Sequence, residues 1–308
     1  MKLAQTRDVV DGVLLLNKPR GLSSQQAVGC IKRLFSAKKA GHTGTLDPLA
    51  DGLLPIGLGE ATKFTQFLLD ADKTYLATIA LGAVTTTGDA EGEVLKERLV
   101  DLSREQIDQV IPKFIGAITQ VPPMYSAIKL NGKPLYTYAR NGQSIDRESR
   151  SIFINSLEVI DFIGSSLTVR VSCSKGTYIR VLAEDIGDAL QCGAHLASLT
   201  REQAGQFRLS DAIGIDELER LDLPARRVLL KPLDSFADTL PVLKLVDADK
   251  SRLLKGQSVT IEQIINSQYR LFGLNGEFFG VGAVLDGVLS AQRLLNTQLS
   301  IKSLKELE

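Results

Sequence analysis

Cysteine and histidine are both scarce in this sequence of 308 residues. Its three cysteines, Cys30, Cys173 and Cys192, lie far apart and form no CxxC pair. An odd number of isolated cysteines argues against a disulfide framework and favours a reducing, cytoplasmic compartment. The two histidines, His42 and His195, cannot be combined with these cysteines into a zinc site of ordinary spacing. The sequence therefore predicts a metal-free cytoplasmic protein.

Long hydrophobic runs are also missing. No stretch approaches the roughly eighteen uninterrupted apolar residues that indicate a membrane-spanning helix, so we expect no membrane partner. The N-terminal segment includes Asp8 and Asp11 and lacks the apolar core of a secretory signal. An apolar fraction of 44% and a charged fraction of 23% are those of an ordinary globular protein. The length suffices for one large domain and one small one.

Nucleotide-binding motifs are absent as well. The sequence contains no GxxxxGK[ST] pattern, so a nucleoside triphosphate is not an expected fuel. Residues 57–62 begin like a dinucleotide-binding fingerprint, but Glu60 intrudes and Thr62 replaces the final small residue. The GxSxG turn of serine hydrolases is not found either. We therefore expect chemistry that uses no cofactor.

The charge of the chain is balanced but unevenly distributed. The formal net charge is zero, which by itself does not indicate a nucleic-acid-binding protein. Residues 12–46 and 109–145, however, contain no acidic residue at all. These stretches favour a positive face suited to a phosphate backbone, although chance clustering on solvated helices would look the same. Their basic residues are Lys18, Arg20, Lys32, Arg33, Lys38, Lys39, Lys113, Lys129, Lys133 and Arg140.

Short strands and helices follow one another along the first part of the chain. Residues 12–16 form an apolar run typical of a buried strand, and residues 74–81 show the weaker alternation of another strand. Capping-box patterns of serine and glutamine at residues 23–26 and 103–106 predict the starts of two amphipathic helices.

The later part of the chain sets the fold class. Residues 152–163 and 167–173 read as a hairpin, and a helical apolar stripe follows it. Because no regular βαβ repeat is present, we predict an α+β fold with a mixed, largely antiparallel sheet. Short apolar segments near the C-terminus suggest a small β-rich domain. The predicted domains are residues 1–245 and residues 246–308.

Asp47 is the carboxylate of greatest interest. It precedes Pro48 in a loop rich in glycine, at residues 40–48, that contains no other acidic residue. The residues alone favour an ordinary turn position for Asp47 and a satisfied loop histidine for His42.

A resemblance to a known family changes that interpretation. Residues 41–52 resemble the catalytic motif of TruB-type pseudouridine synthases, with its GHxGxLDPxAxG core intact. Other segments are similar to further motifs of the family, and they occur in the same order: residues 12–24, 120–140, 173–180 and 193–201. The matches together span about residues 12–205. The C-terminal residues are similar to the PUA-like domain of the family.

The resemblance implies a pseudouridine synthase fold and a reaction. The family isomerises one T-loop uridine, at tRNA position 55, to pseudouridine without a cofactor. Asp47 would be the catalytic carboxylate, forming a covalent intermediate or stabilising a ribosyl cation. Arg180 would lie against Asp47, and Tyr75 would stack on the flipped uracil and help to move a proton. The residues alone favour a solvated position for Arg180 and core packing for Tyr75.

Substrate-binding residues are also implied by the resemblance, because the reacting uridine has to leave its stack. Tyr178 and Leu199 would wall the base pocket. His42 would fill the space that the uridine vacates, and Lys18 would shape the floor of the site.

The expected partner is the T-arm of tRNA, whose loop is read by its bases and whose stem is held through its phosphates. A segment near residues 103–150, which contains Lys129, is similar to the tRNA-facing region of the family. No protein partner is expected to be required, and the absence of heptads favours a monomer.

Other functions remain compatible with parts of the sequence. One is a protein that binds or folds RNA on the same scaffold without catalysis, for which Asp47 would be dispensable. Another is the catalytic subunit of a guide-RNA-directed complex, although the tail from Ser300 lacks the extra basic residues usual there. A glycoside hydrolase would need paired carboxylates, and Asp51 and Glu60 show no special pairing.

Overall fold

A computed structural model describes residues 9–262 and 265–296 of the chain. Asp8 and the tail from Ser300, on which some of the expectations above depend, lie outside these described residues. Within them, no helix is long and apolar enough to cross a membrane.

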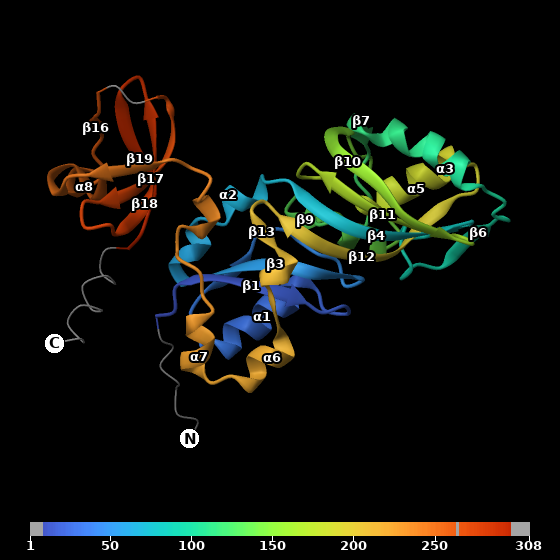
Figure 1. Ribbon diagram of the computed structural model, residues 1–308, viewed down its shortest axis with the longest axis horizontal. Helices are drawn as coiled ribbons and strands as arrows, with labels where there is room; N and C mark the ends of the chain where they lie inside the picture. The colour runs from blue at the N-terminus through green and yellow to red at the C-terminus, as the bar shows by residue number, and fades with distance from the viewer. Residues whose placement is uncertain (1–8, 263–264, 297–308) are drawn as a thin grey trace.

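A ten-stranded sheet forms the body of the molecule (Figure 1). Its order is β14-β1-β3-β12-β4-β11-β10-β7, with β13 paired to β12 and β2 paired to β3. The β1–β14 and β3–β12 pairs are parallel and the other pairs are antiparallel. The predicted α+β class with a mixed, largely antiparallel sheet is confirmed. The strands are β1 Gly12–Lys18, β2 Ala40–His42, β3 Ala50–Leu58, β4 Lys73–Leu81, β7 Gly116–Gln120, β10 Arg150–Ile163, β11 Ser166–Cys173, β12 Ala194–Ala204, β13 Phe207–Arg208 and β14 Ile213–Gly214.

The helices begin where the capping patterns predict. The Ser23 side chain accepts from the Gln26 amide at the start of α1 (Ser24–Leu34), and Ser103 caps α3 (Arg104–Val110) through Gln106 in the same way. The helical apolar pattern that follows the β10–β11 hairpin corresponds to α5 (Ile179–Ala189). The other α-helices of the described residues are α2 Gln66–Leu69, α4 Leu135–Arg140, α6 Ile215–Arg220, α7 Leu223–Val228 and α8 Asp247–Leu254.

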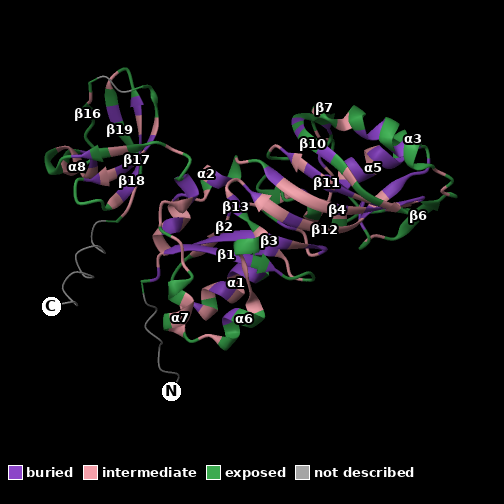
Figure 2. Ribbon diagram, in the orientation of Figure 1, coloured by how far each residue is buried: buried purple, intermediate pink, exposed green. Residues whose placement is uncertain are grey.

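Strand β1 is covered on both faces, which explains its continuous apolar run. Leu14 and Leu16 face a core cluster that includes residues of α1, while Val13 and Leu15 face another that includes Phe64. Figure 2 shows the resulting buried centre of the sheet.

Two of the core clusters meet where β3, β12 and β4 adjoin. One cluster packs beneath α5 and α3, and the other packs beneath α1. Tyr75 on β4 and Leu199 on β12 contact both clusters. Both residues therefore lie at the junction, where side chains from distant parts of the sequence come together.

A second sheet of five strands lies at one end of the molecule (Figure 1). It fits a PUA-like domain, and its order is β15-β17-β18-β19-β16. Phe278 packs edge-on against Phe64 of the larger body, with ring centroids 5.2 Å apart. Glu60 accepts the Asn296 amide at 2.7 Å, so polar contacts reinforce the joint. The strands are β15 Val242–Leu245, β16 Val259–Thr260, β17 Ser267–Gly273, β18 Phe278–Leu285 and β19 Val288–Leu294.

Replacing Gly52 with alanine should destabilise the fold strongly. Gly52 has φ +94°, and a Cβ there would lie 2.6 Å from the Arg201 carbonyl oxygen on the neighbouring strand. A positive φ alone costs a non-glycine residue about 1–2 kcal/mol. Gly164→Ala is the matched control, because Gly164 also has a positive φ of +59° but nothing within 4 Å. In urea unfolding, Gly52→Ala should lose at least about twice the free energy that Gly164→Ala loses. Equal losses would contradict the close approach of β3 to β12.

Candidate active site

The loop that carries Asp47 is anchored on both sides of that residue. The Ser24 hydroxyl, in the first turn of α1, accepts from the Leu46 amide at 2.7 Å and donates to the Leu46 carbonyl at 2.9 Å. The Gly21 amide donates to the Pro48 carbonyl at 2.7 Å. Because both neighbours are fixed, the Asp47 backbone has little freedom to turn its carboxylate elsewhere.

Asp47 forms an ion pair with Arg180. The Asp47 Oδ2 and Arg180 Nη2 atoms are 3.0 Å apart. The Arg180 side chain is only 6% exposed, whereas the Asp47 side chain is 45% exposed. A buried cation thus holds a carboxylate that an incoming molecule can reach. The interpretation of Arg180 as a solvated helix residue does not fit this burial.

Arg180 has further partners that hold its guanidinium in place. It donates to the Tyr125 carbonyl at 2.6 Å and to the Thr87 carbonyl at 3.2 Å. Its Nε lies 3.6 Å from Asp89 Oδ2. Asp89 is itself buried and accepts from the Thr87 hydroxyl at 2.5 Å. A buried charge needs this kind of compensation, so Arg180 is confined to one position.

Tyr75 and Leu199 lie beside each other across β4 and β12. Tyr75 is the cross-strand partner of Arg201, and Leu199 is the partner of Ala77. Both side chains are partly buried at the junction of the two core clusters. Burial raises the pKa of the Tyr75 hydroxyl above its ordinary value, so the phenol stays neutral near pH 7.

Tyr178 immediately precedes α5 and is fixed through its backbone. Its amide donates to the Gln120 side-chain oxygen at 3.0 Å, and the Gln120 amide group donates to the Tyr178 carbonyl at 3.3 Å. Gln120 is buried at the end of β7. Burial raises the pKa of the Tyr178 hydroxyl, which therefore also stays protonated.

His42 and Lys18 lie close to the loop that carries Asp47. The Gly44 amide donates to His42 Nδ1 at 3.2 Å, so this nitrogen acts as an acceptor. Burial, and then the charge of Arg201, lower the pKa of His42, which favours a neutral ring at pH 7. Lys18 is fully buried and donates to the carbonyls of Pro19 and Leu22. Burial lowers its pKa to about 8.

Lys129 lies apart from these residues. It is exposed on a small hairpin formed by β8 (Lys129–Leu130) and β9 (Lys133–Pro134). The structure thus gathers Asp47, Arg180, Tyr75, Tyr178, Leu199, His42 and Lys18 around the strand junction and leaves Lys129 on the surface.

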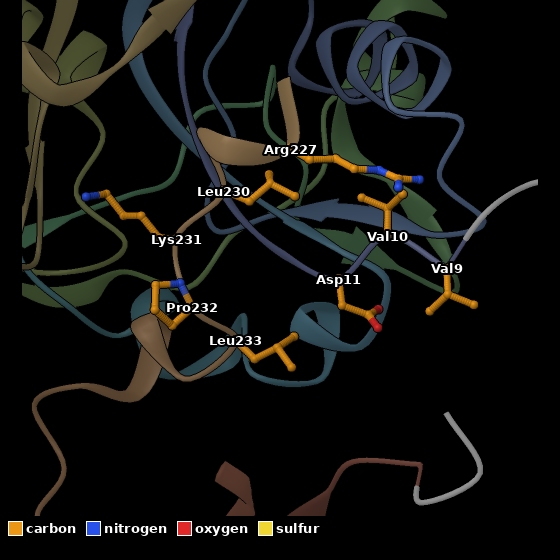
Figure 3. A pocket seen from close by; sticks show the side chains of 8 residues that line it. All are labelled: Val9, Val10, Asp11, Arg227, Leu230, Lys231, Pro232 and Leu233. Carbon is orange, nitrogen blue, oxygen red and sulfur yellow. The ribbon is translucent and has the colours of Figure 1, made fainter. Parts of the chain in front are cut away.

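A pocket of about 480 Å³ opens elsewhere, beside the start of β1 (Figure 3). None of the predicted site residues lines it. Its lining residues are Val9, Val10, Asp11, Arg227, Leu230, Lys231, Pro232 and Leu233. In the described part of the chain, no group of three or more His, Cys, Asp or Glu side chains is placed to hold a metal ion.

Known protein families match most of the chain. Residues 32–179 match the model of the TruB family pseudouridylate synthase N-terminal domain. Residues 180–237 match the tRNA pseudouridylate synthase B C-terminal domain, and residues 241–295 match the pseudouridine synthase II TruB C-terminal model. Proteins called tRNA pseudouridine synthase B from Dechloromonas aromatica and Ralstonia nicotianae are each 50% identical to the chain. The first match covers 89% of this chain and 91% of that protein, and the second covers 95% and 96%.

This chain belongs to the TruB family of pseudouridine synthases. A solved structure of a Cbf5–Nop10–Gar1 complex contains a similar chain, with 26% identity and a TM-score of 0.70. That match covers 92% of this chain and 84% of the other. The predicted family and enzyme class are confirmed.

Sequence reasoning missed three side chains of this TruB-family synthase. Asp89 received no role, because nothing in a single sequence distinguishes it from Glu91 or Glu93. Gln120 and Arg201 stand inside recognised motifs but received no role. Both are buried polar residues whose partners lie far away in the sequence.

The buried Lys18 should make the stability of this TruB-family protein depend on pH. Its pKa is about 8 in the folded chain, below its ordinary 10.5, so between these values the unfolded chain binds more protons. The cost of the buried charge is therefore present below pH 8 and is relieved as the pH rises. Relative to Lys18→Met, the wild type should gain about 1 kcal/mol per pH unit between pH 8 and 10 in urea unfolding. A difference that stays constant with pH would contradict the buried charge.

Proposed function

We propose that this chain isomerises a uridine in the T-loop of tRNA, at position 55, to pseudouridine. The observation that carries the proposal is the pair of a half-exposed Asp47 carboxylate and a buried Arg180 guanidinium, 3.0 Å apart. The relatives that are named tRNA pseudouridine synthase B support the same reaction and substrate.

Asp47 is the group that we assign to bond cleavage. The reaction breaks the bond between uracil N1 and ribose C1′, turns the freed base, and joins C5 to C1′. One proton leaves C5 and one is taken up at N1. A carboxylate can form a covalent intermediate or stabilise the positive charge on the ribose as the bond breaks. The Arg180 guanidinium donates to the Asp47 carboxylate and holds it in one orientation. Atoms balance within the RNA, so no second substrate is consumed.

The side chains around Asp47 can receive a uridine that has left its stack. Tyr75 offers a neutral aromatic face for stacking, and its hydroxyl can relay the proton that leaves C5. Tyr178 and Leu199 would form the walls of the base pocket. His42, neutral at pH 7, would fill the space behind the extruded nucleotide.

RNA contacts outside the pocket are assigned by surface and charge. The exposed hairpin with Lys129, in the segment near residues 103–150, would hold phosphates of the T-arm. We assign the predicted domain of residues 1–245 to catalysis, except for β15 (Val242–Leu245), which pairs with β17 of the small sheet. Together with β15, residues 246–308 are assigned to a PUA-like domain that touches the acceptor side. The chain would act as a monomer in the cytoplasm, without a protein partner.

The rival functions explain the site less well. A protein that only binds RNA has no use for an ionised carboxylate exposed towards a negatively charged ligand. A glycoside hydrolase needs two accessible carboxylates. Asp89 is the acid that shares Arg180 with Asp47, but it is only 5% exposed. Glu60 pairs with Lys63 at 2.7 Å, near the joint with the small domain.

Mapping of the product tests the proposed function. An unmodified tRNA transcript is incubated with the protein, and pseudouridines are located by carbodiimide labelling and primer extension. We expect one new stop, at the T-loop uridine, and none in a transcript with that uridine changed to cytidine. A stop at another position would overturn the assigned site. Tight binding without any stop would favour the RNA-folding function.

Neutralising Lys129 and Lys133 should weaken tRNA binding and flatten its salt dependence. Each lysine that neutralises a phosphate contributes about 0.9 to the slope of log affinity against log salt concentration. The double variant Lys129→Gln/Lys133→Gln should therefore lose up to about two units of slope in filter-binding measurements. Lys96→Gln is the control, since Lys96 is exposed on β6 (Val94–Glu97) outside this segment. An unchanged slope in the double variant would place the RNA elsewhere.

A further inference from the structure

Arg201 is a buried cation that the proposed chemistry has not yet used. It lies in the middle of β12, is 1% exposed, and is among the largest fully buried side chains of the protein. Burying a charge is costly unless ionic or polar partners compensate it. Among the residues that the structure describes, Arg201 makes no ion pair with a carboxylate. Two hydrogen bonds of its guanidinium go to backbone carbonyls, and its side chain is also hydrogen-bonded to Tyr75.

These hydrogen bonds connect Arg201 to the catalytic loop. Its Nη2 donates to the Gly44 carbonyl at 3.2 Å, three residues before Asp47, and its Nε donates to the Leu53 carbonyl on β3 at 2.7 Å. One planar group therefore fixes the loop that carries Asp47 and the strand that follows it.

Arg201 also lies next to Tyr75, on the other side of the site. It is the cross-strand partner of Tyr75 on β4, so the two side chains emerge on the same face of the sheet. β12 lies between β3 and β4, as Figure 1 shows, and Gly52 allows β3 to approach at this position. Arg201 is thus placed between the loop of Asp47 and the ring of Tyr75.

The positive charge of Arg201 influences the pKa values of neighbouring side chains. It lowers the pKa of the neighbouring His42, after the larger effect of burial, and acts in the same direction on Lys18 and Tyr75. An apolar side chain could fill the same volume at a smaller desolvation cost. A role confined to packing therefore does not account for a cation at this position.

We propose that Arg201 is a positioning residue, which fixes the Asp47 loop relative to Tyr75 and does not itself touch the RNA. This inference rests on the proposed function, because it assigns Arg201 to the same reaction. A misplacement of reacting groups by about 1 Å can slow a reaction roughly 100-fold. Loss of the two carbonyl hydrogen bonds should therefore slow the chemical step and leave tRNA affinity unchanged.

The test compares Arg201→Gln and Arg201→Lys with wild type. Arg170→Gln is the matched control, since Arg170 is an arginine on β11 of the same sheet, on the far side of β4, and pairs with Glu202 at the surface. In single-turnover conversion of tRNA, both Arg201 variants should react at least about tenfold more slowly, with dissociation constants within about threefold of wild type. Arg170→Gln should match wild type in both measurements.

A second readout does not depend on activity. The pKa of His42, followed by NMR, should rise toward its ordinary value in Arg201→Gln, because a nearby cation is gone, and should stay low in Arg201→Lys. The signal of His195, the only other histidine, provides an internal reference.

Each contrary result has a defined meaning. Rates within threefold of wild type, equal losses of rate and affinity, or an unchanged His42 pKa in Arg201→Gln would overturn the positioning role. Failure of both variants to fold would assign Arg201 to the fold instead. Absence of conversion by wild type would contradict the proposed function, and the His42 titration would still test the placement of Arg201's charge.

Discussion

The structure of the site follows from the need to compensate one buried cation. Arg180 lies in the first turn of α5, where a positive charge opposes the helix dipole and burial removes its water. Asp89 and the carbonyls of Thr87 and Tyr125 replace that water and confine the guanidinium. Asp47 completes the set from a different part of the chain. Helix α5, the turn before Asp89 and the loop of Asp47 are thereby held together by one side chain.

The two acidic partners of Arg180 differ in exposure, and that difference decides which of them a substrate can reach. Asp89 is enclosed, so it can only hold the arginine, whereas Asp47 remains open to a substrate. Arg201 is a second buried cation near the Asp47 loop, and its guanidinium, like that of Arg180, donates to backbone carbonyls. Tyr75 and Leu199 lie at the junction of two core clusters, so their positions are fixed by packing on both sides. These contacts fix the side chains around Asp47, whose carboxylate stays open to a substrate.

Local patterns predicted the elements of this fold, and distant contacts explain what was missed. The strand at residues 12–16 and the helix starts at Ser23 and Ser103 depend on neighbouring residues, and the structure has them where they were predicted. The importance of Asp47 and Arg180 came from a family motif, because no local rule separates them from turn and surface residues. The partners of Arg201 lie 148 and 157 residues away, so its place could not be read from its own segment. The role of Asp89 likewise depends on its contact with Arg180, which lies 91 residues later in the sequence.

Release of tritium from tRNA labelled at uridine C5, by the wild type and by Asp47→Asn, tests the central claim most directly. Asparagine keeps the size of the side chain and removes its charge, and binding assays establish that the RNA is still held. The account predicts release of about one tritium per tRNA by the wild type, and none by the variant at a tRNA affinity within a few-fold. Undiminished release by Asp47→Asn would show that this carboxylate does not carry the reaction.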